Sequence, residues 1–360
     1  MMELKLFVLF GTIVYTCLGA GEIGDKCLLT DNESEGMCIL ITDCQVALNE
    51  IRTKNYHKYK RCGFKDLTEI VCCPQKPIDK FGDTERRLGR VADKECKKIV
   101  ENSIPPLVLH IIGGETAGMG EFPHMVALGY EAPEGYIFQC GGTLLSNLFV
   151  ISAAHCVDTL DQIKPTIVRM GVVDLGQSTR NNETDVDIKE IITHPQYTRR
   201  HKYHDLALLR LDKAVQFSSI VSPACLFTSL KDPDMPLTIT GWGRTSNIKN
   251  IRNNMLQKAK VTVVSREKCG ESYSSWRKLP FGISEEQLCA GDPNGLTDTC
   301  QGDSGGPLQG LTGMDGHYRL VGITSFGRGC GSPIPGVYTR IASYLDWIEG
   351  VVWPDSTSER

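Results

Sequence analysis

Three residues of this chain carry the groups that nucleophilic hydrolysis requires: Ser304, His155 and Asp205. A serine hydroxyl is a weak nucleophile until a neighbouring base takes its proton and nearby donors stabilise the oxyanion that forms. His155 can act as that base, and Asp205 can fix the tautomer of its ring. The backbone N–H groups of Gly302 and Ser304 are the candidate oxyanion donors. The chain order His, Asp, Ser is one of the known orders for such a triad, so we predict a serine hydrolase.

The elements that must position these groups are expected to be β-strands. An apolar run at 144–151 precedes His155 and is typical of a buried strand. Short apolar segments separated by Gly, Pro, Asp and Asn turns favour antiparallel barrels. Apolar residues at helical spacing over 342–351 indicate a closing helix. An alternative has Ser304 as a turn residue, His155 as a packed core histidine and Asp205 as a cap. This alternative would be the better interpretation if the three residues were scattered, but each of them lies within a recognisable motif.

Six motifs occur in order along the second part of the chain. They are Ile111-Ile-Gly-Gly114, Ser152-Ala-Ala-His-Cys156, His204-Asp-Leu-Ala-Leu-Leu209, Gly241-Trp-Gly243, Gly302-Asp-Ser-Gly-Gly-Pro307 and Pro335-Gly-Val-Tyr338. With these motifs, residues 111–350 resemble the trypsin-like serine proteases of the chymotrypsin fold. The resemblance implies an all-β fold: two six-stranded antiparallel β-barrels with the triad in the cleft between them, and a C-terminal helix. It also implies a serine endopeptidase that uses no cofactor.

The same resemblance assigns the substrate-binding residues. Asp298 is expected at the floor of the primary specificity pocket, with Gly327 and Gly336 in its walls. A buried carboxylate needs a positive partner, so we predict cleavage after Arg or Lys, with Arg favoured by its bidentate geometry. A capped turn aspartate is the alternative for Asp298. The substrate backbone is expected to pair with the segment that begins at Ser325, as an added strand.

The amino-terminal residues predict secretion. Residues 1–20 combine an early lysine, an apolar run and small residues at the end, which is typical of a signal peptide. The formal net charge of −4 gives no reason to expect nucleic-acid or membrane binding. Sequons at Asn32 and Asn182 are candidate glycosylation sites. We therefore expect a secreted, extracellular glycoprotein.

Cysteine usage points to the same compartment and divides the chain. Of 15 cysteines, Cys17 lies in the predicted signal peptide, and the remaining 14 suit seven disulfides. Six of them crowd into residues 27–73, a domain too small to be held by burial alone. Spacing alone permits 15 pairings, and a zinc site is the rival interpretation. The ending Cys72-Cys73-Pro74 resembles the clip domain of arthropod proteases, which implies the pairs Cys27–Cys72, Cys38–Cys62 and Cys44–Cys73.

Resemblance also implies the pairs of the protease region. These are Cys140–Cys156, Cys269–Cys289 and Cys300–Cys330. Cys96 and Cys225 remain, and their pairing would keep the two parts of the chain bonded after a cut between them.

Residues 74–110 read as a charged, proline-containing linker without a convincing periodic element, open to proteolysis. In the trypsin-like family, cutting before the Ile-Ile-Gly-Gly motif frees the amino group of Ile111. Its ammonium is expected to pair with Asp303 and to order the oxyanion loop and pocket. The chain is therefore expected to be an inactive zymogen.

The residue before that cut is His110, where the family usually has Arg or Lys. A trypsin-like enzyme should cut this bond poorly, so we expect an upstream activating protease of different specificity, although drift at a tolerant cleavage site is the alternative. The same departure resembles the clip-protease subgroup that includes Snake and Persephone. The segment could also serve as bait for microbial proteases.

Three functions follow from these observations. The first is a regulatory protease of an extracellular cascade in innate immunity, for Toll or prophenoloxidase activation, or in dorsal-ventral development. For this first function, the resemblance implies a downstream protease zymogen as substrate and a serpin as inhibitor, with haemolymph as the location. The second is a venom or digestive protease. The third is a non-catalytic clip homologue, which the intact triad argues against.

Two further stretches of the sequence each admit a functional interpretation. The basic stretch 197–204 is either an exosite for an acidic partner or a solvated loop, and the solvated loop is favoured. Some clip proteases bind calcium in the loop after Arg169. Here Val172 stands where a Glu ligand is expected, although Glu183, Asp185 and Asp187 follow. We assign no metal.

Overall fold

The computed structural model describes residues 23–29, 35–44, 47, 51, 57–65, 68–74, 89–102, 115–243, 254–274, 276–292, 303–312, 315–327 and 334–354. The chain divides into two compact units, residues 1–83 and 84–360, here named the N-terminal unit and the C-terminal unit. Within the described residues, no helix is long and apolar enough to cross a membrane.

The N-terminal unit is a small antiparallel sheet with strand order β1-β2-β4-β3. Among its described residues, the buried cluster consists of Cys44, Ala47 and Val71, which is little apolar surface for a stable fold. Disulfides compensate by joining β1 to β4 and β2 to β3, and by tying the end of η1 to β4. The elements are β1 (Lys26–Leu28), β2 (Glu35–Leu40), η1 (Ile41–Asp43), β3 (Arg61–Lys65) and β4 (Thr68–Pro74).

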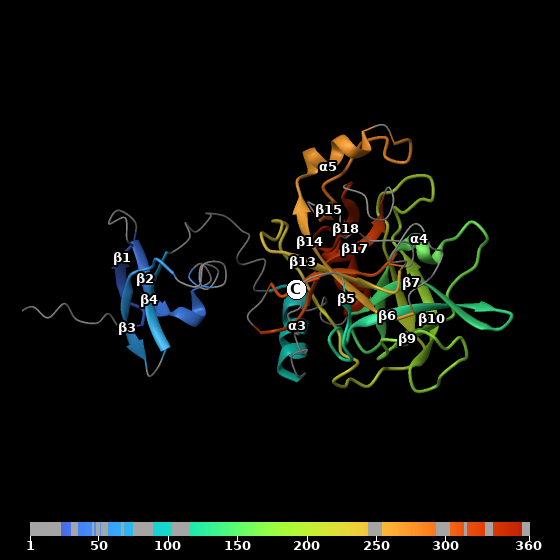
Figure 1. The fold of residues 1–360 in the computed structure, drawn as a ribbon, viewed down its shortest axis with the longest axis horizontal. Coiled ribbons are helices and arrows are strands. Elements are labelled where there is room, and N and C mark those ends of the chain that lie inside the picture. The colour runs from blue at the N-terminus through green and yellow to red at the C-terminus, as the bar shows by residue number, and fades with distance from the viewer. Residues whose placement is uncertain are drawn as a thin grey trace, which may run out of the picture. The chain divides into compact units, whose positions relative to one another are not determined.

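The C-terminal unit contains a first closed barrel with strand order β10-β11-β8-β7-β6-β9 (Figure 1). All of its neighbouring strands are antiparallel, and β9 pairs with β10 to close the ring. Its strands are β6 (Met125–Ala132), β7 (Gly135–Leu144), β8 (Phe149–Ser152), β9 (Ile167–Met170), β10 (Asp185–Thr193) and β11 (Ala207–Leu211).

The second barrel follows the order β17-β16-β13-β14-β15-β18 and closes where β18 pairs with β17. The prediction of two six-stranded antiparallel barrels is therefore confirmed. Two short strands extend the second sheet: β5 (Glu115–Thr116) pairs with β14, and β12 (Cys225–Leu226) runs parallel to β17. The barrel strands are β13 (Leu237–Gly241), β14 (Gln257–Val264), β15 (Gln287–Gly291), β16 (Pro307–Gly310), β17 (Arg319–Phe326) and β18 (Gly336–Arg340).

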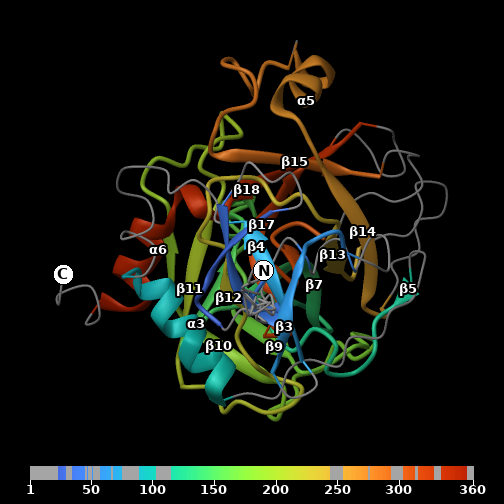
Figure 2. The same cartoon turned by 90° about the vertical axis from the view of Figure 1, so that its left-hand side faces the viewer.

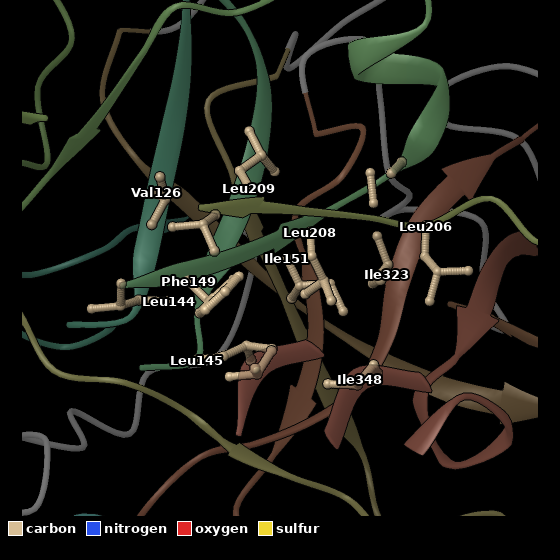
Figure 3. Packing of buried hydrophobic residues seen from close by; sticks show 14 of the residues in the cluster. Val126, Leu144, Leu145, Phe149, Ile151, Leu206, Leu208, Leu209, Ile323 and Ile348 are labelled. Carbon is tan, nitrogen blue, oxygen red and sulfur yellow. The ribbon is translucent and has the colours of Figure 1, made fainter. Parts of the chain in front are cut away.

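The largest hydrophobic core joins the first barrel to the second and to the C-terminal helix. Figure 3 shows Leu206 and Ile151 from the first barrel close to Ile323 of β17 and Ile348 of the helix. Because these side chains pack at interior density, a shift of one barrel would disturb the other. This core fixes the framework on which residues from both barrels meet.

Helices occupy the periphery of the C-terminal unit. The predicted closing helix is present as α6 (Leu345–Val352), which follows η2 (Ile341–Ser343). Three further helices among the described residues are α3 (Val91–Asn102), α4 (Ala154–Val157) and α5 (Arg266–Tyr273), and the Ser265 hydroxyl caps the amino end of α5. Figure 2 shows α3 beside α6, which agrees with their contacts.

The expectation that residues 74–110 lack a regular element was wrong, because α3 lies within them. Val91, Ala92 and Cys96 are buried and attach this helix to the body, while most of its other positions are charged. Cys96 is bonded to Cys225, and Arg90 pairs with Glu349 of α6. Tertiary contacts therefore stabilise a helix whose apolar face is narrow. The signal present in the sequence was the spacing of Val91, Ala92, Cys96 and Ile99.

Candidate active site

His155 lies in the single-turn helix α4, directly after the buried strand β8. Its neighbour Cys156 is bonded to Cys140 of β7, so a disulfide holds the turn against the barrel wall. The side chain of His155 is 25% exposed, which leaves one edge of the ring open to a ligand. The expected position of a catalytic base at the end of an apolar strand agrees with this placement.

Asp205 precedes β11 and is 1% exposed. Its Oδ1 accepts the backbone N–H of His155 at 2.9 Å, and its Oδ2 lies 2.8 Å from Nδ1 of the same residue. Burial alone would raise the pKa of Asp205, but the charge of His155 and hydrogen bonds from His155 and Ser325 lower it to about 2. Asp205 is therefore a carboxylate at neutral pH.

This carboxylate fixes the tautomer of the imidazole. Since Asp205 can only accept, Nδ1 of His155 carries the proton between them. Nε2 of the neutral ring is then the acceptor and can receive a proton from a hydroxyl group.

Ser304 is held in a tight turn at the entrance to β16. Its carbonyl accepts the N–H of Gly141 in β7 at 2.8 Å, which joins this turn of the second barrel to the first. The next residue, Gly305, has φ +77°, and a Cβ there would lie 2.6 Å from the carbonyl oxygen of Gly141. Only glycine fits at that position. Gly141 adjoins Cys140, so a short path of bonds connects the Ser304 turn to Cys156 and His155.

Two of the expected substrate-binding residues lie at ends of barrel strands. Ser325 is buried near the end of β17, and Gly336 begins β18. Gly327 follows β17, and nothing stands within 4 Å of the position that a Cβ would take there. Asp298 and Gly302 lie outside the described residues, as do His110, Ile111, Asn32, the pair Cys300–Cys330 and the signal peptide.

Comparison with known proteins assigns the family. A trypsin family model matches residues 111–348. Serine protease snk of Drosophila melanogaster is 36% identical over 356 residues, which cover 92% of this chain and 79% of the relative. CLIP domain-containing serine protease B4 of Anopheles gambiae is 31% identical over 357 residues, which cover 92% and 93%. The chain belongs to the clip-domain serine proteases of arthropods. It is thus a trypsin-like serine endopeptidase.

Serine protease Hayan of Drosophila melanogaster is also similar, at 38% identity over 268 residues. These residues cover 72% of this clip-domain protease and only 42% of that relative. Six disulfides are present among the described residues of the present chain. They coincide with six of the seven pairs that the family resemblance implies.

Two residues that hydrogen-bond to Asp205 in the site of this clip-domain protease were not predicted in this role from the sequence. The hydroxyl of Ser325 donates to Oδ2 of Asp205, and the Thr339 hydroxyl donates to the Asp205 carbonyl at 2.9 Å. Both come from the second barrel, 120 and 134 residues away. No local sequence motif predicts hydrogen bonds between residues so far apart in the chain. Ser325, expected only to bind the substrate, therefore also orients the triad.

Asp303 lies against Gly241 and Gly243, which flank the Trp of the Gly-Trp-Gly motif. The N–H of Gly243 donates to Oδ1 of Asp303 at 2.9 Å. A Cβ on Gly243 would come within 2.5 Å of Oδ2, so the absence of side chains on these glycines makes room for the carboxylate. The motif therefore has a steric reason to carry glycine at both positions.

Two of the three acidic residues considered for calcium, Asp185 and Asp187, are engaged by arginines. Asp185 is buried and accepts Nε of Arg169 at 2.6 Å. Asp187 forms a two-pronged pair with Arg180. Each guanidinium satisfies the charge that a cation would otherwise balance.

In the part of the chain that the structure describes, two groups of Cys and His side chains lie close enough together to suggest a metal site. They are Cys27 with Cys38 and Cys62, and Cys140 with His155 and Cys156. Every cysteine in both groups is disulfide-bonded, so none is available as a thiolate ligand.

Proposed function

We propose that this protease is a secreted zymogen that, once cut before Ile111, cleaves protein substrates after Arg or Lys in an extracellular proteolytic cascade. The observation that carries the proposal is the network His155–Asp205–Ser325, which leaves Nε2 of His155 available as the base that the proposed nucleophile Ser304 requires.

In the proposed reaction, Ser304 Oγ attacks the carbonyl carbon and its proton passes to Nε2 of His155. The carbonyl oxygen becomes an oxyanion that the N–H groups of Gly302 and Ser304 stabilise. His155 returns the proton to the leaving amine, and the C–N bond breaks to leave an acyl group on Ser304. Water then repeats the sequence, with His155 again the base, and releases the acid. Asp205 stabilises the transient imidazolium throughout.

Preference for Arg or Lys rests on Asp298 at the pocket floor, where a long cationic side chain would neutralise its charge. Glycine at 327 and 336 keeps the expected pocket walls free of side chains. This part of the proposal follows from the motif register fixed by Ser304.

Activation rests on the cradle around Asp303 between Gly241 and Gly243. The new ammonium of Ile111 would pair with this carboxylate, because a poorly hydrated carboxylate gains most from a directly paired cation. His110 before the bond argues for an upstream activator that is not trypsin-like.

The cascade role is supported by the N-terminal disulfide unit and by the similar proteins. Proclotting enzyme of Tachypleus tridentatus is 31% identical over 87% of this chain, and its name denotes a proenzyme. We place the protein in innate immunity, with a downstream protease zymogen as substrate and a serpin as inhibitor, in haemolymph. Exposed Asn182 precedes β10, where glycosylation is sterically open.

The test uses full-length protein whose segment Leu107–His110 is replaced by the recognition sequence of a site-specific protease, so that cleavage leaves Ile111 as a new amino terminus. We expect hydrolysis of an Arg-anilide but not a Phe-anilide, only after cleavage, and none in the Ser304→Ala variant. Preference for the Phe-anilide would contradict the assigned specificity. In a second test, efficient cutting of the native Ser304→Ala zymogen at His110–Ile111 by trypsin would contradict the need for a special activator.

A further inference from the structure

Lys202, in the basic stretch 197–204, is held by backbone hydrogen bonds, and its ammonium forms no salt bridge among the described residues. Its backbone N–H donates to the Lys278 carbonyl at 3.1 Å, and its carbonyl accepts Nε2 of Gln287 at 2.7 Å. The loop between β10 and β11 is therefore tied to the second barrel at this residue. By contrast, Arg199 in the same stretch is already paired with Asp158.

The Lys202 side chain is half-buried against an aromatic group. Its Nζ lies 5.7 Å from the ring centroid of Phe326, whose ring also packs 5.0 Å from that of Trp276. Burial lowers the pKa of Lys202, and the charge of Lys278 lowers it further. Among the described residues, no carboxylate lies within 4.0 Å of this ammonium. Asp205 attracts it at longer range but already binds His155 and Ser325.

Phe326 belongs to a stretch of strand with a free edge. The pairing of β16 with β17 ends at Ile323, and the backbone of Thr324 bonds to Gly305 and Gly306. On the other edge, Phe326 pairs with Val337 of β18. From Ser325 to Gly327, the first edge therefore has no strand partner among the described residues. An extended peptide can add there as a strand.

We propose that Lys202 is a specificity-determining residue that binds the carboxylate of an Asp or Glu in the substrate, on the amino-terminal side of the cleaved bond. A peptide paired with Ser325–Gly327 runs past the Phe326 ring, where the ammonium of Lys202 is held. A carboxylate at that place meets a cation that is already partly dehydrated and positioned, so little ordering is required on binding. Exposed Lys278 adds charge of the same sign near Lys202.

The preferred substrate is then an acidic segment followed by Arg or Lys at the cut. This inference rests on the proposed function, because it assumes that the substrate binds as a protease substrate with its amino-terminal side along Ser325–Gly327. It assigns the basic stretch to the acidic-partner interpretation, but through one residue at the cleft rather than through the whole loop.

The experiment compares fluorogenic peptides that end in Arg at the cut and differ upstream only by Glu or Gln, at each of the three positions before that Arg. With the activated full-length enzyme, we expect kcat/KM to be about 10-fold higher for Glu at one position. Lys202→Gln should abolish the difference, and Lys202→Glu should invert it, so that the Gln peptide is cleaved faster than the Glu peptide. Hydrolysis of a single-residue Arg-anilide should change less than two-fold in Lys202→Gln. Lys213→Gln, an exposed lysine beyond β11, is the matched control and should keep the Glu preference.

The outcomes separate this inference from the proposed function. Equal rates for Glu and Gln at every position, with Arg peptides still cleaved, would overturn the role of Lys202 alone. Retention of the Glu preference in Lys202→Gln would do the same. Failure to cleave any Arg or Lys peptide would instead contradict the proposed specificity of the enzyme.

Discussion

The backbone N–H of Ala92 donates to Oε1 of Glu349 at 3.0 Å, so a carboxylate from α6 caps the amino end of α3. Glu349 is 1% exposed and also accepts Nε of Arg90 at 3.2 Å. One buried side chain thus satisfies an unpaired helix donor and balances a half-buried guanidinium.

Replacing Glu349 by Ala is expected to destabilise the C-terminal unit by about 2 kcal/mol, because it removes the buried carboxylate that pairs with Arg90 and the acceptor of the Ala92 N–H. The melting temperature should fall by roughly 5 °C. Asp346→Ala is the matched control. It removes the other acid that contacts Arg90, but Asp346 is 89% exposed, so the change should stay below about 1 kcal/mol. Equal shifts for the two variants would contradict the capping role.

Replacing Ser325 by Ala should lower kcat by about 10-fold with little change in KM for an Arg-anilide. The hydroxyl donates to Asp205, and without it the carboxylate loses one of the contacts that orient His155. Steady-state kinetics of the activated enzyme measure the effect. An effect on KM alone would show that Ser325 serves only to bind substrate.

The pKa of Asp205 predicts a specific loss of stability in acid. Its folded pKa is depressed to about 2, against about 3.9 in an unfolded chain. The stabilisation, about 3 kcal/mol, is therefore fully present above about pH 5 and is lost as the pH falls through the folded pKa near 2. Denaturant titrations should show a shallower decline for Asp205→Asn than for the parent between these pH values. Parallel curves would contradict the depressed pKa.

Calcium removal should leave the melting temperature unchanged. Asp185 and Asp187 are paired with Arg169 and Arg180, so binding of a cation would have to break these pairs. Thermal denaturation in EDTA and in excess calcium checks this expectation. A rise of several degrees with calcium would show that the loop binds the ion after rearranging.

Arg169→Met, by contrast, should destabilise the protein strongly, because the buried carboxylate of Asp185 would be left without its ion-pair partner.

The sequence predicted those features whose signals are local. The apolar run before His155 and the glycines around Ser304 reflect a strand and a turn that need those residues in place. The two barrels followed from the family motifs, which are likewise short.

Features that depend on distant pairs were not predictable in the same way. The hydrogen bond from Ser325 to Asp205 spans 120 residues. The helix α3 has a narrow apolar face and depends on Cys225 and Glu349, which lie on other elements. The match of Lys202 with Phe326 likewise arises only when the β10–β11 loop meets the end of β17.

The attachment of α3 has a consequence for what proteolysis can change. A cut anywhere between Asn102 and Glu115 leaves the two pieces joined by Cys96–Cys225 and by the Arg90–Glu349 pair. A surface that binds the N-terminal unit would therefore also retain the protease domain. The linker between the two would set the local concentration of the protease domain at that surface. The proposed activating cut would therefore leave the location of the molecule unaltered, and release into solution would require a second event, such as reduction of that disulfide or a cut amino-terminal to α3.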